Sequence, residues 1–246
     1  MEEEKFLAPN VEISVQDLEE IQHLNNPIVG IQPIVKKYLD AIKVARQDSN
    51  KFYFSDGTST VEIRIISDEI IRVKLAPNSV FLEEFSYAVP SLDQKVTVFT
   101  YKETDTKYII ATNTVQCFIG KEDFFISFAD IQGNEDIQPM HFEENTAFGG
   151  YYVYCTKKCN SGESFYGLGD KPTDFNLRGK RFHNWNTDTY SFSKHQDPLY
   201  RSIPFYLSLK EGESYGIFFD NTFRTTFDFS HERRNVTTFC ADGGEM

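Results

Sequence analysis

Apolar and polar positions alternate with a period of two along much of the chain after residue 51. The clearest cases are residues 61–65 and 71–75, two alternating segments separated by a short polar turn. Alternation of this kind places apolar side chains on one face of a strand and polar side chains on the other. The pattern predicts an antiparallel strand pair with one face on the core and one face in water.

Short apolar runs bounded by Gly, Asn, Asp or Pro continue to the end of the chain, without a long helical pattern between them. This spacing is typical of a large antiparallel sandwich. Between Gly162 and Pro204 the chain becomes polar and rich in aromatic residues, and we expect a long functional loop there. The sequence therefore predicts an all-β, mostly antiparallel fold with further strands at 95–101, 108–111, 115–119, 124–128, 150–155, 203–209, 215–220, 225–229 and 235–239.

Residues 1–35 have a different pattern and are interpreted as an N-terminal appendage to a β-domain of residues 36–246. Ser14 is a candidate helix N-cap, and apolar residues then recur every three positions from Val15 to Leu24, which predicts one short amphipathic helix. Residues 37–46 have helical propensity but lead into the turn-forming cluster 48–50. A helix and a β-hairpin are both compatible with that segment.

Composition restricts the partners. The 246 residues include 25 basic and 37 acidic side chains, a net charge of −12, which disfavours nucleic acid and anionic membranes. Aromatic residues reach 15%, as in β-structure or an aromatic-lined surface for a neutral partner such as a sugar. The N-terminus lacks a basic and then apolar signal, and no apolar run approaches 18 residues. We therefore expect a cytoplasmic protein without a membrane partner.

Motifs for metals, cofactors and common nucleophiles are weak. Cys155 and Cys159 form a CxxxC pair, but no HxxxH or HxH accompanies it, so we expect free thiols and no metal site. Gly167 and Gly169 lack the third glycine or the GK[ST] of a phosphate loop, which favours a tight turn and no cofactor. GxSxG and HExxH are absent, and sequence alone selects no catalytic pair among 37 carboxylates.

The segment 178–190 has the highest density of side chains suited to recognition. It contains the only tryptophan, Trp185, together with His183, Asn186, Asp188 and Tyr190. Sugar binding uses flat aromatic faces against C–H surfaces and carboxylates or amides against neighbouring hydroxyls. On composition alone, a sugar-contacting loop and a packed structural loop both remain open.

Ordered blocks of sequence around this segment resemble the N-terminal domain of glycoside hydrolase family 31, which includes α-glucosidases and α-xylosidases. The blocks are residues 165–170, 176–180, 184–190, 197–205 and 215–221, and the strand pair ending at 70–77 is also similar. The resemblance covers about residues 35–246. It implies a galactose-mutarotase-like β-supersandwich that precedes a (β/α)₈ barrel, with a catalytic Asp nucleophile and an Asp general acid on that barrel.

The resemblance also implies what this chain does and does not contain. The sequence stops before a barrel, which needs about 250 further residues, so we expect a fragment with no catalytic residue of its own. Its partners would be the C-terminal barrel of the parent chain and an α-linked oligosaccharide. By residue-by-residue match, Asp188 would bind substrate hydroxyls and Tyr190 would flank the bound sugar. The match leaves a turn-capping role for Asp188 and a core position for Tyr190 open.

Trp185, His183 and Asn186 are interpreted as supports of the same loop. The leading function is that of an α-glucosidase N-terminal domain. A stand-alone carbohydrate-binding or interaction module is the first alternative. An aldose 1-epimerase, which would need a carboxylate beside His183 or His195, is the second alternative.

Overall fold

The computed structural model describes residues 36–83, 85–89, 97–131, 137–147 and 150–243. These residues form strands and connecting loops without an α-helix, so the predicted all-β, antiparallel fold is confirmed. No helix in the described part is long and apolar enough to cross a membrane. The helix predicted at residues 15–24, and the whole appendage 1–35, lie outside the described residues.

The strands form three sheets in which every pair is antiparallel. The four-stranded sheet has the order β2 (Val44–Asp48), β3 (Lys51–Ser55), β4 (Thr60–Ile65), β5 (Ile71–Ala76). The three-stranded sheet has the order β12 (Ser164–Gly169), β14 (Ser202–Lys210), β15 (Glu213–Phe218). The ten-stranded sheet has the order β13 (Arg181–Asn184), β16 (Thr225–Phe229), β17 (Val236–Ala241), β11 (Gly150–Lys158), β10 (Ile137–Ala147), β9 (Ile126–Asp130), β8 (Val115–Gly120), β7 (Lys107–Ala111), β6 (Thr100–Glu103), with β1 (Lys36–Tyr38) paired to β10.

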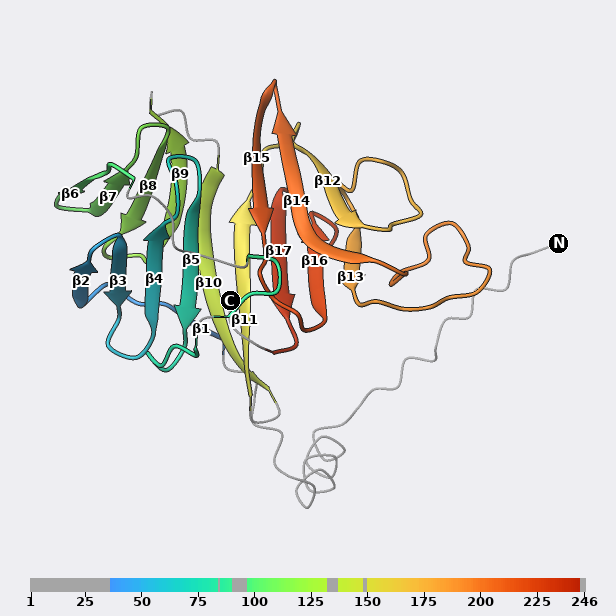
Figure 1. Ribbon diagram of the computed structural model, residues 1–246, viewed down its shortest axis with the longest axis horizontal. Helices are drawn as coiled ribbons and strands as arrows, with labels where there is room; N and C mark the ends of the chain where they lie inside the picture. Colours follow the sequence, from blue (N-terminus) through green and yellow to red (C-terminus); the bar gives the residue numbers. More distant parts are fainter. Residues whose placement is uncertain (1–35, 84, 90–96, 132–136, 148–149, 244–246) are drawn as a thin grey trace, which may run out of the picture.

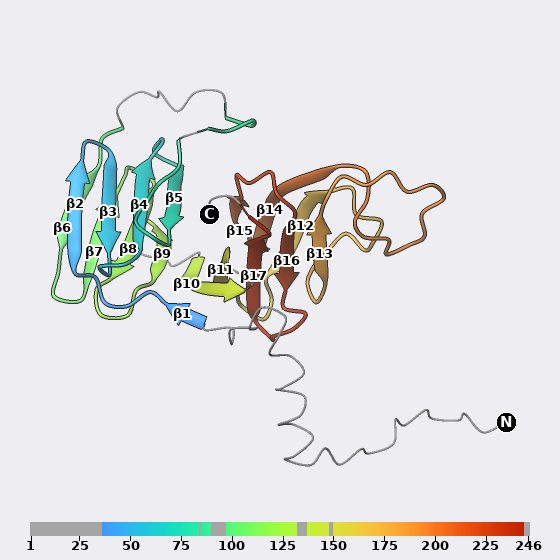
Figure 2. The same ribbon diagram turned by 90° about the horizontal axis from the view of Figure 1, so that it is seen from below.

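The two smaller sheets lie side by side on the same face of the ten-stranded sheet (Figures 1 and 2). Buried side chains fill the space between these layers as one apolar cluster. Aromatic contacts connect the layers on both sides of the domain: Phe54 packs 5.1 Å from Tyr108, and Phe165 packs 4.9 Å from Phe229, measured between ring centroids. Burial of apolar area at this interface is the main favourable contribution to folding.

The water-facing side predicted for the strand pair 61–65 and 71–75 is instead covered. The β4 and β5 pair forms as expected, but its polar residues Glu62, Arg64 and Lys74 are buried. The ring of Phe81 lies 6.0 Å from the Tyr53 ring and 5.6 Å from the Lys74 Nζ, so the chain after β5 folds back over this face. Alternation along a strand cannot reveal a cover supplied by a later segment.

Residues 44–55 form a β-hairpin, which decides between the two alternatives left open there. The stretch 162–204, expected to be one long loop, contains the two strands β12 and β13. Gly167 and Gly169 are not a turn, because they lie in β12 at a shift of register against β14. Both have positive φ, and a Cβ on either would approach a backbone oxygen within 2.5 Å, so only glycine fits this irregularity.

Candidate functional site

The connection between β13 and β14, residues 185–201, is the candidate site and is called the 185–201 loop below. It extends outward from the β13 and β14 side of the domain, together with the connection between β12 and β13 (Figure 1). Both connections are long because β12 and β14 belong to one sheet while β13 belongs to the other. The chain must therefore cross between the layers, and the crossing segments are exposed at the end of the sandwich.

A buried charge fixes the base of the loop. The Lys171 Nζ donates hydrogen bonds to the Asp197 Oδ1 at 2.6 Å and to the His183 carbonyl oxygen at 2.7 Å. The Asp197 Oδ2 accepts a hydrogen bond from the His183 backbone N–H at 2.5 Å. Burial lowers the pKa of Lys171 below its usual range, and the Asp197 carboxylate opposes this shift. Three segments are thus joined beneath the loop by one ion pair and two bonds to the backbone.

Two further hydrogen bonds fix the ends of the loop. The Asn186 Oδ1 accepts a bond from the Ser202 backbone N–H at 2.9 Å, which ties the start of the loop to the first residue of β14. The Tyr200 hydroxyl donates to the Thr189 carbonyl oxygen at 2.7 Å. The ring of Phe192 meets the Tyr200 ring edge-on at 5.8 Å. The loop is therefore held by contacts within itself and with β14, although it lies outside the core.

His183 lies on β13, directly opposite Thr226 of β16 in the ten-stranded sheet. Its Nδ1 lies 3.0 Å from the Thr226 hydroxyl oxygen on the neighbouring strand β16. Burial, and then the nearby Arg224 charge, lower the pKa of His183, so the ring is neutral at pH 7. The Nδ1 of His195 lies 3.1 Å from the Thr173 hydroxyl oxygen. Neither of these contacts supplies the carboxylate partner that an epimerase base would use.

The middle of the loop exposes the two residues expected to contact substrate. Tyr190 is 97% exposed, so it is not a core aromatic, and Asp188 is also exposed. Within the described part of the chain, neither side chain has a hydrogen-bond partner, so the turn-capping role of Asp188 is not seen there. Trp185 is 52% exposed and lies next to Asn186. A free carboxylate and two open aromatic faces are therefore presented within six residues.

Sequence reasoning did not single out three other exposed aromatic residues, two in the 185–201 loop and one in the connection between β12 and β13. Phe175 is exposed and lies 4.9 Å from the Tyr166 ring, while Phe192 and Tyr200 form the contact described above. Tyr200 falls in the block 197–205 that carried the family resemblance, so that block was the available signal. These rings add exposed aromatic surface at the end of the sandwich.

The cysteines have no site chemistry in the structure. Cys155 and Cys159 are buried and form no disulfide, and burial raises the pKa of the Cys155 thiol. A buried neutral thiol packs as a small apolar side chain. Among the described residues, no three His, Cys, Asp or Glu side chains gather in a way that could hold a metal ion.

Comparison with known proteins places this arrangement in a family. The model of the glycosyl hydrolase 31 N-terminal galactose mutarotase-like domain matches residues 60–228. The chain belongs to this family of domains, and the resemblance inferred from its sequence blocks is confirmed. The shared feature is the mutarotase-like β-domain.

Individual relatives differ in activity. Alpha-glucosidase 2 of Bacillus thermoamyloliquefaciens is 31% identical over 200 residues, covering 79% of this chain and 24% of that protein. Alpha-xylosidase XylQ of Lactiplantibacillus pentosus is 33% identical over 84 residues, covering 34% of this chain and 10% of that protein. The Flavobacterium johnsoniae GH31 dextranase, solved in complex with isomaltotriose, superposes with a TM-score of 0.75 and 29% identity, covering 85% of this chain and 26% of that one. This chain therefore spans about a quarter of the length of the α-glucosidase and of the dextranase.

Proposed function

We propose that the chain is the N-terminal domain of a retaining α-glycosidase that hydrolyses α-glucosidic bonds in oligosaccharides. The observation that carries the proposal is the match to the family 31 N-terminal domain in a chain that spans only about a quarter of its relatives. The two catalytic aspartates would lie on a barrel that follows residue 246. This domain would supply no reacting group and would complete the substrate pocket from one side.

The geometry of the 185–201 loop supports this role. The Lys171–Asp197 pair and the Asn186–Ser202 bond hold its base, while Asp188 and Tyr190 are exposed at its middle. A carboxylate with two oxygens can accept hydrogen bonds from neighbouring hydroxyls of one sugar, and a tyrosine ring can cover the sugar's C–H face. A fixed base with open recognition groups is the arrangement that positions substrate without a large entropy cost on binding.

An α-glucoside is the substrate that the relatives favour. One relative is named an α-glucosidase, and the dextranase structure contains isomaltotriose. An α-xylosidase is also among the relatives, and a xyloside differs from a glucoside by the absence of one hydroxymethyl group. Discrimination of this kind depends on the shape of the pocket around one small group. We therefore place the choice between these two sugars on the barrel side of the pocket.

The test uses the full reading frame that contains this chain. We expect the encoded protein to continue for several hundred residues and to hydrolyse nitrophenyl α-glucoside and isomaltose faster than nitrophenyl α-xyloside. The purified 246-residue chain should be inactive on all three, because binding alone cannot supply a barrier reduction of about 8–23 kcal/mol. A reading frame that stops at Met246, or turnover that copurifies with the 246-residue chain, would contradict the proposal.

A further inference from the structure

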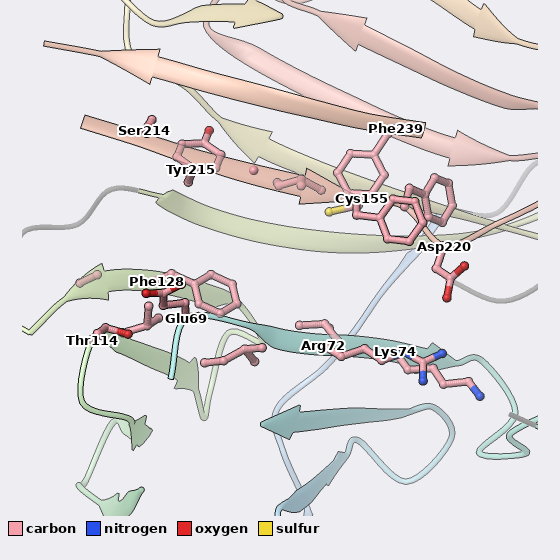
Figure 3. A pocket seen from close by; sticks show the side chains of 18 of the residues that line it. Glu69, Arg72, Lys74, Thr114, Phe128, Cys155, Ser214, Tyr215, Asp220 and Phe239 are labelled. Atoms are coloured by element: carbon pink, nitrogen blue, oxygen red, sulfur yellow. The ribbon is translucent and has the colours of Figure 1, made fainter. Parts of the chain in front are cut away.

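The two smaller sheets are separated by a cleft of about 540 Å³ that is lined by their facing strands. We call it the edge cleft. One wall is formed by residues 71–74 of β5 and the other by residues 214–218 of β15, while Phe128, Cys155 and Phe239 of the ten-stranded sheet line its floor (Figure 3). The cleft is therefore an apolar-floored gap in the second layer of the sandwich.

The walls of the edge cleft are strand edges. Successive side chains of a strand point to opposite faces, so a wall lined by consecutive residues must be the backbone edge. In the described part of the chain β5 is the last strand of its sheet, and so is β15. Two sheet edges that face each other across an apolar floor are an unusual arrangement, because open edges are sites of further strand pairing.

The hydrogen-bond pattern identifies which backbone groups point into the edge cleft. The Ile66 N–H donates to the Ile70 carbonyl oxygen, so every second residue from Ile70 onward bonds to β4. The backbone N–H and C=O groups of the residues between them, Ile71, Val73 and Leu75, therefore point away from β4 and into the edge cleft. The Phe219 N–H donates to the Pro204 carbonyl. By the same alternation along β15, the backbone N–H and C=O groups of Ser214, Gly216 and Phe218 point away from β14.

The two edges also have matching directions. In Figure 3, Arg72 and Lys74 follow each other along β5 in the same direction in which Ser214 and Tyr215 follow each other along β15. Figure 1 shows the arrows of β5 and β15 pointing the same way. A single strand between two strands of equal direction can pair antiparallel with both. Every strand pair in the described part of the chain is antiparallel, so a strand that filled this gap in the same pattern would run opposite to β5 and β15.

The last described residues of the chain lie beside the edge cleft. The Gly243 carbonyl oxygen accepts a hydrogen bond from the Asn221 Nδ2 at 2.9 Å, and the Asp242 N–H donates to the Arg224 carbonyl oxygen at 2.9 Å. Phe219 and Asp220, which line the edge cleft, immediately precede this contact. Gly243 therefore lies beside Asn221, just past the C-terminal end of β15 at Phe218. Polypeptide that continues from this end into the gap runs opposite to both strands.

We propose that a β-strand from the polypeptide that follows Met246 occupies the edge cleft, pairs antiparallel with β5 and β15, and joins the two smaller sheets into one. The proposal rests on the proposed function, because it requires the parent chain to continue past residue 246. Side chains on one face of that strand would pack on Phe128 and Phe239, so alternate residues should be apolar. The N-terminal domain would then be completed by the chain that leads toward the catalytic barrel.

Residue-resolved amide hydrogen exchange tests this proposal on the full-length parent protein and on the 246-residue chain. We expect the amides of Ile71, Val73, Gly216 and Phe218 to exchange more slowly in the parent by about tenfold or more. The inward amides of Tyr215 and Ile217 already bond within the sheet and serve as internal references. The open edge of β6 should show equal exchange in both proteins, because the proposal places nothing there.

A pair of proline variants gives an independent measurement. Val73→Pro removes an amide that points into the edge cleft, and Glu103→Pro removes one that points outward from β6, because the Thr104 N–H bonds to Lys107. In the parent protein, Val73→Pro should lower the melting temperature of this domain further than it does in the 246-residue chain. Glu103→Pro should lower it by the same amount in both proteins.

The outcomes separate this inference from the proposed function. A parent protein that hydrolyses α-glucosides but shows equal exchange at the β5 and β15 edges in both proteins would overturn the inference and leave the function standing. Protection already present in the 246-residue chain would also overturn it. In that case, loss of protection on deletion of residues 1–35 would assign the edge cleft to the N-terminal segment, and dependence on protein concentration would assign it to a second copy.

Discussion

Lys171 and Asp197 form an ion pair of 2.6 Å beneath the candidate site, although 26 positions separate them in the sequence. Their side chains are 3% and 14% exposed. The same Asp197 carboxylate binds the His183 backbone, and the same ammonium group binds the His183 carbonyl. The pair therefore connects the segment after β12, the end of β13 and the end of the 185–201 loop. The 185–201 loop therefore depends on the charge of Lys171, which lies outside it.

Replacing Asp197 should destabilise the domain. Asp197→Ala leaves the buried Lys171 ammonium without its carboxylate, and breaking one side of a buried pair costs about 3–5 kcal/mol. We expect the urea midpoint of the 246-residue chain to fall accordingly. Asp174→Ala is the matched control, since the Asp174 carboxylate is exposed and solvent screens its ion pairs with Lys180 and Lys194, so its loss should change stability little. Equal losses in the two variants would show that the pair is not the anchor.

A second buried charge cluster should be equally sensitive. The Glu163 Oε1 accepts hydrogen bonds from the Lys157 Nζ at 3.1 Å, the Ser208 hydroxyl at 2.6 Å and the Tyr215 hydroxyl. The Lys157 and Glu163 side chains are 0% and 2% exposed. Glu163→Ala should reduce the free energy of unfolding by about 3–5 kcal/mol because it strands a buried ammonium.

The double variant shows whether the loss comes from that stranded charge. Lys157→Met combined with Glu163→Ala removes both charges, so it should be more stable than Glu163→Ala alone. A double-mutant cycle in urea measures the coupling between the two residues. If the two losses simply add, the carboxylate acts through Ser208 and Tyr215 and not through Lys157.

Stability should decrease as the pH falls below 7. Burial and the Arg224 charge lower the pKa of His183 in the folded chain, so the unfolded chain binds a proton first as the pH falls through about 6.5. Protonation therefore favours the unfolded state increasingly until the pH reaches the lower pKa that His183 has in the folded chain. For Glu163, burial raises the pKa, but the Lys157 charge and the hydrogen bonds outweigh burial and lower it. The stabilisation that the ionised Glu163 provides is therefore complete above its unfolded-state pKa of about 4.3 and is lost as the pH falls below that value toward its folded-state pKa.

Two histidine variants test the contribution of His183 above pH 5.5. His183→Gln keeps a polar group toward Thr226 and cannot become charged, so its urea midpoint should fall less than that of the wild type between pH 7.5 and pH 5.5. Exposed His231, whose ring bonds to the Gly179 carbonyl, provides the control variant His231→Gln. An unchanged pH profile in His183→Gln would exclude His183 as the source of the decrease.

The sequence predicted the strands well where they alternate and lie between clear turns. Residues 225–229 were expected as a strand and form β16, and the hairpin at 44–55 was one of two open alternatives. Strand β12 was missed because Gly167 and Gly169 resemble a turn locally, while in the structure β14 holds them in an extended strand with positive φ. Glu62 was expected in water because the segment around Phe81 that covers it lies outside the strand pair.

The candidate site was only partly predictable for the same reason. The exposed position of Tyr190 agrees with an aromatic residue in a polar loop, but nothing local indicates that Lys171 and Asp197 meet beneath it. Asn186 lies in the predicted loop, and its bond to Ser202 depends on where β14 begins. Contacts between segments that are distant in sequence follow from the crossing of two layers, which no short motif encodes.

The aromatic side chain of Tyr190 should contribute to substrate binding in the parent enzyme. Tyr190→Ala should lower kcat/KM by about threefold to tenfold, since an aromatic contact contributes roughly 0.5–1.5 kcal/mol. Tyr190→Phe should retain most of the activity if the ring face is what binds. Because the residue is 97% exposed, neither variant should shift the melting temperature. Loss of activity in Tyr190→Phe equal to that in Tyr190→Ala would assign the effect to the hydroxyl.

Asp188 provides the sharpest test of the loop's role. Its carboxylate is exposed and has no hydrogen-bond partner in the described part of the chain, so it is available to bind two neighbouring sugar hydroxyls. Hydrogen bonds to a charged group contribute about 1.5–3 kcal/mol, and 1.4 kcal/mol corresponds to a factor of ten. Asp188→Ala should therefore lower kcat/KM of the parent enzyme by about tenfold to a hundredfold with no change in melting temperature. Asp105→Ala, an exposed carboxylate in the β6–β7 turn, should change neither quantity. A value of kcat/KM within twofold of wild type, or an unfolded domain, would show that Asp188 supports the loop and does not contact substrate.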